Sequence, residues 1–223
     1  MQLLLTSAGV NNPSIRQALV DLLGKPIEES NALCIPTGAY SPPWATPAGP
    51  WRFMTGRTNQ PMVDLPWKSM GILELTALPT IDRERWVAWV READALLLCG
   101  GDALYTAHWM RESGFDELLP TLTDTVYVAF SAGSMALTPR VGEDFVYEFR
   151  PPGGGDRTLG VVDFSIFPHV DHPDLAENTM AAAEKWAAEI GGPAYAIDDD
   201  TAIRVVDGAV DIVTEGHWRR FDA

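Results

Sequence analysis

One serine of this sequence follows an apolar stretch in a pattern that is typical of a catalytic nucleophile. Residues 126–130 read Val-Tyr-Val-Ala-Phe, and Ser131 comes next, ahead of Ala-Gly-Ser. A sharp strand-to-helix turn that presents a nucleophilic hydroxyl needs small residues two positions away, and Ala129 and Gly133 meet this need. The backbone N–H of Ala132 could then donate to an oxyanion. The competing interpretation is that Ser131 only caps the following helix, since serine is a favoured N-cap.

Two further features are expected beside Ser131, because each follows a predicted strand. Gly100 and Gly101 come directly after Leu-Leu-Leu-Cys, and a glycine pair lets the backbone turn an N–H towards an oxyanion, although it could also form a simple turn. His169 follows Ile-Phe-Pro. Carboxyl ends of parallel strands meet at one edge of a sheet, so we expect His169 to act as general base. The other histidines lie in less suitable places: His108 in a predicted helix, His172 in a polar loop and His217 near the C-terminus.

The segment His169-Val170-Asp171-His172 also contains residue types that bind metal ions. A metal site usually draws further ligands from elsewhere in the chain, and no third histidine or cysteine stands out as a partner. We therefore expect neither a metal nor another cofactor.

Strand and helix patterns alternate along the chain. This alternation predicts an α/β fold with a doubly wound, mainly parallel sheet and flanking helices. Asp207-Gly208-Ala209 between two apolar runs predicts a C-terminal antiparallel hairpin. The predicted strands are residues 3–6, 32–36, 70–75, 94–99, 126–130, 163–167, 201–206 and 210–214, and the predicted helices are 14–23, 82–92, 103–113, 131–138 and 173–190.

Composition limits the classes of partner. The 223 residues carry a formal net charge of −15, with no basic run, so the surface would repel nucleic acid and anionic membranes. Cys34 and Cys99 lie in apolar runs and are too few for a disulfide framework. The N-terminus lacks the basic start of a signal peptide and no apolar stretch is long enough for a membrane span, so we expect a cytoplasmic protein. The sequence leaves open whether the protein forms a homodimer.

Residues 40–66 are unusually rich in proline and tryptophan. They are too apolar for a free linker, so we expect a packed excursion over one end of the sheet that could serve as a lid. The length of the chain is compatible with a single domain over residues 1–223, of which this excursion is a part.

The features above resemble the peptidase E (aspartyl dipeptidase) family, whose relatives include cyanophycinase. The resemblance spans residues 90–215 and rests on the glycine pair, on Phe-Ser-Ala-Gly around Ser131, on Pro-His at His169 and on Thr-Ala-Ile-Arg-Val at 201–205. It implies a fold similar to that of class I glutamine amidotransferases, with serine in place of their cysteine. It also implies peptide hydrolysis through an acyl-enzyme by a Ser-His-acid triad without a metal, with Ser131 as nucleophile and His169 as base.

The sequence offers several candidates for the acid of the triad. In aspartyl dipeptidases it is a glutamate just before the last hairpin, and matching that segment places Asp199 there. Asp198 and Asp200 flank this position and stay as alternatives, and Asp144 is a further candidate. At least one of the three consecutive aspartates should simply form a solvated turn.

Two segments depart from the dipeptidase pattern. The glycine loop continues as Asp102-Ala103, where the dipeptidases usually have Asn-Thr. The segment after His169 is acidic, whereas in those enzymes it carries basic residues near the substrate; its acidic members are Asp171, Asp174 and Glu177. We expect such a site to repel an aspartyl side chain, whereas a free α-amino group would suit Asp102 or Asp171.

These observations favour a serine peptidase that hydrolyses dipeptides or other short peptides, with a specificity that is not strictly aspartyl. Two other interpretations stay open. The fold could bind a small metabolite or a partner protein without catalysis, or the same site could act as an esterase or amidase on a non-peptide substrate.

Overall fold

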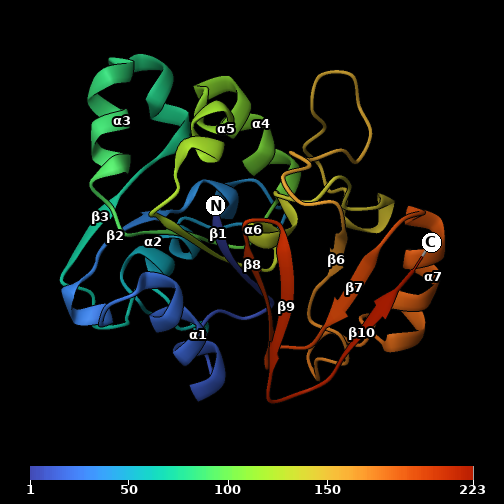
Figure 1. Ribbon diagram of the computed structural model, residues 1–223. Helices are drawn as coiled ribbons and strands as arrows, with labels where there is room; N and C mark the ends of the chain where they lie inside the picture. Colours follow the sequence, from blue (N-terminus) through green and yellow to red (C-terminus); the bar gives the residue numbers. More distant parts are fainter. Residues whose placement is uncertain (223) are drawn as a thin grey trace.

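A large sheet and a small sheet, with helices around them, form the computed structural model, which describes residues 1–222 (Figure 1). The large sheet has seven strands in the order β3-β2-β4-β5-β1-β8-β9. Its first five strands in this order run parallel, and β8 and β9 are antiparallel, as the predicted fold class requires. The strands are β1 (Gln2–Thr6), β2 (Asn31–Ile35), β3 (Ser69–Ile72), β4 (Ala95–Leu98), β5 (Val126–Phe130), β8 (Thr201–Val206) and β9 (Ala209–Thr214).

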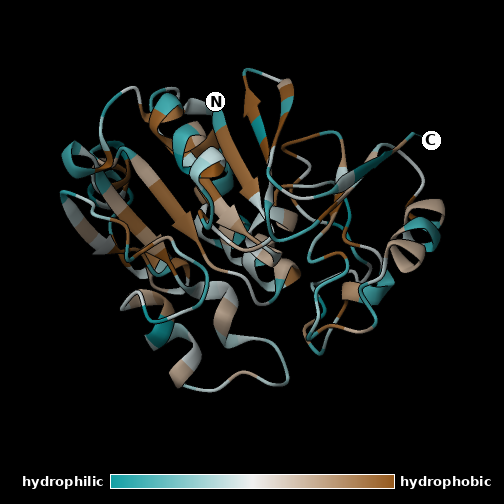
Figure 2. Ribbon diagram, turned by 90° about the horizontal axis from the view of Figure 1, so that it is seen from below, coloured by the Kyte–Doolittle hydropathy of each residue, from teal (hydrophilic) through white to brown (hydrophobic). Residues whose placement is uncertain are grey.

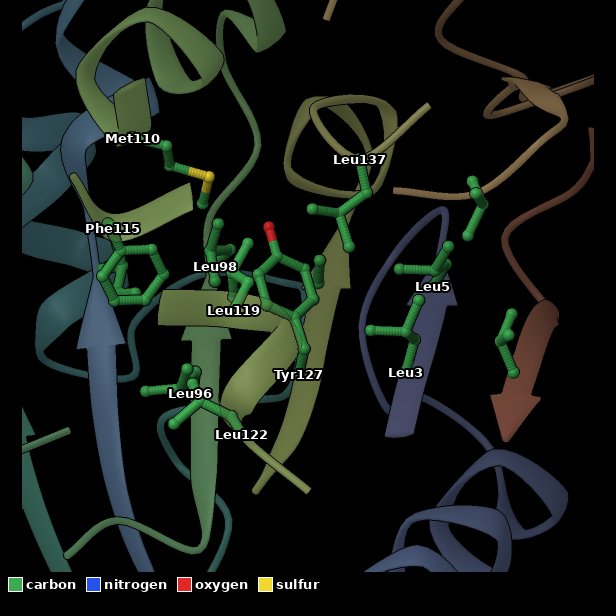
Figure 3. Packing of buried hydrophobic residues seen from close by; sticks show 14 of the residues in the cluster. Leu3, Leu5, Leu96, Leu98, Met110, Phe115, Leu119, Leu122, Tyr127 and Leu137 are labelled. Atoms are coloured by element: carbon green, nitrogen blue, oxygen red, sulfur yellow. The ribbon is translucent and has the colours of Figure 1, made fainter. Parts of the chain in front are cut away.

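Helices cover both faces of the large sheet, which explains why its central strands are continuous apolar runs. Every residue of β4 is buried, and Figure 2 shows hydrophobic colour along the central strands. On one face, Leu3 and Tyr127 belong to a core cluster with Phe115 (Figure 3). On the other face, Leu4 packs in a second cluster with Leu19. Neighbouring residues of one strand thus serve opposite cores, as the period of two in a strand dictates.

The helices follow their caps closely. Asn12 caps the first helix: Pro13 stands at its first position, and the Asn12 side chain accepts the N–H of Ile15. Gly24 ends that helix in the left-handed conformation. No helix of residues 1–222 has both the length and the apolar character that crossing a membrane requires. The α-helices are α1 (Pro13–Leu23), α2 (Ala48–Met54), α3 (Arg83–Arg91), α4 (Ala103–Ser113), α5 (Phe115–Leu118), α6 (Ala132–Met135) and α7 (Met180–Ile190).

One strand ends earlier than predicted because a short 3₁₀ helix follows it. The strand expected over residues 70–75 stops at Ile72, because the Glu74 side chain accepts the N–H of Thr76 and a 3₁₀ helix begins. The 3₁₀ helices are η1 (Ile27–Glu29), η2 (Thr37–Tyr40), η3 (Leu75–Thr80), η4 (Leu119–Thr121) and η5 (Glu143–Phe145).

The helix expected over residues 173–190 starts only at Met180. Thr179 is its N-cap and accepts the N–H of Ala182. The preceding residues form turns instead, in which His172 O accepts the N–H of Leu175. A good cap inside the apolar pattern thus moved the helix start by two turns.

The small sheet corrects the predicted topology. Residues 163–167 were expected to join the large sheet, but β6 pairs with β7 in a separate sheet of order β10-β7-β6, which lies beside the large sheet in Figure 1. Its residues form their own core against Trp186 of α7. The strands are β6 (Ser165–Phe167), β7 (Ala194–Ile197) and β10 (Trp218–Phe221).

Candidate active site

Ser131 occupies a strained turn between β5 and α6. Its φ of 51° and ψ of −122° are rare for a residue with a side chain. Such strain costs on the order of 1–3 kcal/mol and clusters at functional sites. The Ser131 side chain makes no capping hydrogen bond with α6, so helix capping does not account for this serine.

The end of β1 holds this turn in place. Thr6 O accepts the N–H of Ser131 at 2.9 Å, and Ser134 Oγ donates to the same oxygen at 2.9 Å. Ser134 Oγ also accepts the N–H of Thr6 at 3.1 Å. A side chain at Gly133 would place its Cβ 2.6 Å from Cys99 O, so the turn tolerates only glycine there. The roles of Thr6 and Ser134, which are both fully buried, were not predicted from the sequence.

The glycine loop after β4 lies against the same turn. Gly101 has a φ of 122°, and a Cβ there would lie 2.1 Å from Gly38 O. A Cβ on Gly100 would lie 3.3 Å from Ser131 Cβ, so the loop and the serine are neighbours. Within residues 1–222, no backbone oxygen accepts the N–H of Gly101 or of Ala132. Both N–H groups can therefore donate to an oxyanion.

His169 reaches this site from the small sheet, in spite of the changed topology. Its φ is 58°, and its N–H donates to Ser7 Oγ at 3.0 Å. Ser7 Oγ in turn donates to Ile197 O at 3.0 Å, and Ser7 is fully buried. Ser7 thus joins the end of β1 to the small sheet and fixes the backbone that carries the imidazole.

Asp199 is the candidate acid that contacts this imidazole. Its Oδ1 lies 2.6 Å from His169 Nδ1. Asp198 instead holds the turn together: its Oδ1 accepts the Thr201 hydroxyl and its Oδ2 accepts the N–H of His217. Asp200 and Asp144 are exposed, and the ion pairs of His169 within residues 1–222 do not include them.

Asp199 is also shared with a second histidine that the sequence analysis placed in a polar loop. His172 Nε2 lies 3.5 Å from Asp199 Oδ2. His172 Nδ1 accepts the N–H of Asp174, so a neutral His172 carries its proton on the nitrogen that faces Asp199. The described residues contain no group of three or more His, Cys, Asp or Glu side chains arranged to hold a metal ion.

Ser131 and His169 line one cavity of about 550 Å³ together with Gly100, Gly101 and Ala132. In the part of the chain that the structure describes, His169 hydrogen-bonds to Ser7 and Asp199 but not to Ser131 Oγ. Contacts between nucleophile and base are often long before substrate binds, and tighten in the complex.

Cys99 also lines this cavity but does not compete as a nucleophile. Burial, with a smaller contribution from the carboxylate of Glu74, raises the pKa of its thiol to about 12. A thiol with this pKa stays protonated near neutral pH, so it does not supply the reactive thiolate.

The two predicted ligands for an α-amino group do not line the cavity. Asp102 is fully buried; its Oδ1 accepts the N–H of Tyr105 and its Oδ2 accepts the Ser41 hydroxyl. Asp171 accepts the N–H of Met180 and pairs with His217 at 3.0 Å. Both carboxylates are thus engaged in structural contacts.

The expected acidic character of the site is also wrong. The structure places none of the described aspartates and glutamates in the cavity lining, so Asp171, Asp174 and Glu177 do not face it. The turns that precede α7 carry these side chains elsewhere, whereas Leu175 and Asn178 of the same segment line the cavity.

Much of the cavity wall comes from the Pro/Trp-rich segment 40–66. Phe53 of α2 is buried against Phe130, the residue before the serine, with ring centroids 5.9 Å apart. Trp44 meets Tyr147 edge-on at 4.7 Å and is 63% exposed. The segment contributes Pro42, Trp44, Ala45, Thr46, Gly49, Arg52, Phe53, Thr58 and Gln60.

A comparison with known families identifies the family of the chain. The sequence model of peptidase family S51 matches residues 3–213. The chain belongs to peptidase family S51. Members of this family are serine peptidases, so the chain is a serine-type peptidase, a hydrolase whose substrates are peptides. The resemblance recognised in the sequence is thereby confirmed.

Solved structures share the fold of this S51 peptidase at low sequence identity. A peptidase from an acI-B1 Actinobacterium has a TM-score of 0.67 and 16% identity, covering 100% of this chain and 94% of the other. A protein from Listeria monocytogenes EGD-e with a provisional peptidase E assignment has a TM-score of 0.63 and 16% identity, covering 96% and 98%. No curated protein sequence matches the chain.

The glycine loop supports a stability prediction. We expect Gly101→Ala to lower the free energy of unfolding by about 3 kcal/mol or more, because the methyl group would collide with Gly38 O at a φ that alanine rarely adopts. Gly208→Ala is the matched control: its φ is also positive, but a Cβ there meets nothing within 4 Å, and its cost should stay near ~1–2 kcal/mol. Urea unfolding measures both. Equal losses would show that the contact with Gly38 does not constrain the loop.

Ser7 supports a second prediction. Ser7→Ala leaves the N–H of His169 without its acceptor and removes one of the two donors to Ile197 O, which keeps the N–H of Val170, so it should cost about 1–3 kcal/mol and lower kcat more than it raises KM. Ser14→Ala, at a half-buried position that does not line the cavity, is the control. If Ser7→Ala retains full kcat, Ser7 does not position His169.

Proposed function

We propose that this S51 peptidase hydrolyses dipeptides or other short peptides through an acyl-enzyme formed on Ser131. His169 would act as general base and Asp199 as the acid that orients it. The observation that carries the proposal is the 2.6 Å contact between Asp199 Oδ1 and His169 Nδ1, at a cavity that both His169 and Ser131 line.

Acylation begins when His169 Nε2 takes the proton of Ser131 Oγ and the oxygen attacks the peptide carbonyl carbon. The carbonyl oxygen becomes an oxyanion, and the free N–H groups of Gly101 and Ala132 donate to it. His169 then passes its proton to the amide nitrogen as the C–N bond breaks. The amine leaves, and the acyl group stays on Ser131 as an ester.

Deacylation repeats these steps with water. His169 takes a proton from a water molecule, whose oxygen attacks the ester carbonyl in the same oxyanion site. Collapse of this intermediate breaks the bond to Ser131 Oγ, and the proton returns from His169 to that oxygen. Deacylation thus releases a carboxylic acid and regenerates the Ser131 hydroxyl.

Asp199 supports both steps by holding the imidazole with Nε2 towards the cavity and by stabilising its positive charge in the transition states. Its second oxygen faces His172 Nε2 at 3.5 Å, which limits rotation of the carboxylate. This filled second side of His169 favours catalysis over the interpretation that the fold only binds a ligand.

The size of the cavity supports short substrates. A volume of about 550 Å³ lies in the range of roughly 300–1,000 Å³ that small ligands occupy. Residues 40–66 form much of its wall, and Trp44 of this segment contacts Tyr147, which also lines the cavity. We propose that residues 40–66 act as a lid. An esterase or amidase reaction would use the same atoms, and a comparison of peptide with ester substrates separates these activities.

Labelling tests the nucleophile. A fluorophosphonate reagent, which reacts with activated serines, should label the wild type at one site and should not label Ser131→Ala. Ser14→Ala removes a hydroxyl that does not line the cavity, and it should retain labelling. Labelling of a folded Ser131→Ala, or none of the wild type, contradicts the assignment.

Neutralising the acid tests the triad. Asp199→Asn preserves shape but removes the charge at His169 Nδ1, so kcat for a dipeptide should fall by about 10²- to 10⁴-fold. Asp200→Asn changes the exposed neighbour and should stay within about twofold of wild type, because surface substitutions away from such contacts have small effects. A fully active Asp199→Asn would place the acid elsewhere.

A further inference from the structure

The charges around the cavity run against the charge of the whole protein. The chain has 31 acidic residues and a net charge of −15. Yet, among the described residues, neither an aspartate, a glutamate nor a lysine lines the cavity. Apart from His169, the charged side chain in its wall is Arg52. An arginine in the wall of the cavity that also holds the nucleophile points to an anionic group on the substrate, because the protein as a whole is acidic.

Arg52 is available for such a role. It lies in the last turn of α2 and is exposed, and the ion pairs of residues 1–222 do not include it. Its backbone is fixed, since Arg52 O accepts the N–H of Arg57 at 2.7 Å. The next residue, Phe53, packs against Phe130. The same helix is thus anchored to the residue that precedes the nucleophile.

Arg57 on the same segment has a different environment. Its guanidinium lies 4.8 Å from the centroid of the Trp51 ring, and it does not line the cavity. Two exposed arginines five positions apart therefore differ in the one respect that matters here, which is access to the substrate.

We infer that Arg52 binds the C-terminal carboxylate of the peptide substrate. This assignment rests on the proposed function and deepens it. A guanidinium offers paired N–H donors that match the two oxygens of a carboxylate. In a dipeptide the leaving residue carries this carboxylate close to the scissile bond, whatever its side chain. Recognition of the chain end then limits the enzyme to short peptides without demanding an acidic side chain.

Binding to a variant that cannot form the acyl-enzyme tests this inference independently of turnover. In Ser131→Ala, titration calorimetry should show that Ala-Ala binds about tenfold more tightly than Ala-Ala amide, the scale expected for a charge-assisted contact in a partly exposed site. Adding Arg52→Gln should weaken Ala-Ala to the level of the amide and leave the amide unchanged. Arg52→Lys should restore part of the difference.

Arg57→Gln in the same background is the matched control, because it removes an equal charge from the same segment. It should keep the preference for the free acid. Equal binding of acid and amide in Ser131→Ala, or equal losses from Arg52→Gln and Arg57→Gln, would overturn the inference. Asp-Ala amide that binds tightly through Arg52 would overturn it as well, because the carboxylate would then be a side chain.

This experiment separates the two proposals. If Arg52 discriminates acid from amide but wild type hydrolyses no peptide, the proposed catalysis fails and the carboxylate site stands. If wild type hydrolyses Ala-Ala and its amide with equal kcat/KM and neither binds through Arg52, the catalysis stands and the carboxylate site fails. Thermal unfolding of each variant checks that the exposed substitutions leave the fold intact.

Discussion

The strained backbone turn at Ser131 is the constraint on which the site depends. A serine at a φ of 51° persists only because Thr6 O accepts its N–H and Ser134 Oγ binds the same strand end. Those bonds exist because β1 lies directly beside β5 in the large sheet. Gly133 completes the turn, since any larger residue would strike the carbonyl that follows β4. Three neighbouring strands therefore determine where one hydroxyl points.

The other half of the site comes from a different sheet, and the buried hydroxyl of Ser7 is one of the links between the two. Ser7 accepts the N–H of His169 and donates to Ile197 O, so it joins the end of β1 to β7. Asp199 follows β7 by two residues and meets the imidazole from behind. The catalytic geometry proposed here thus requires the two sheets to keep their relative position. Residues 40–66 add the outer wall, with Arg52 as its cation.

Elements that depend on a few neighbouring residues were predicted correctly from the sequence. The strand at residues 126–130 and the first strand of the hairpin at 201–206 have the predicted bounds, because apolar runs and an Asp-Gly turn specify them over a few residues. The strand that contains β6 was predicted, but the separate small sheet was missed, since its other strands, β7 and β10, were not predicted and follow later in the chain. Asp199 could not be separated from Asp198 by spacing alone, and loop turns that bury Asp102 or turn Asp171 away leave no such signal.

A crystal structure of the covalent adduct with a fluorophosphonate reagent would locate the nucleophile and the oxyanion site together. We expect phosphorus bonded to Ser131 Oγ, with the phosphonyl oxygen about 2.7–3.1 Å from the nitrogens of Gly101 and Ala132. We also expect His169 Nε2 within hydrogen-bonding distance of Ser131 Oγ, with Asp199 still on Nδ1. An adduct on another residue, or a phosphonyl oxygen turned away from both N–H groups, would contradict the proposed mechanism.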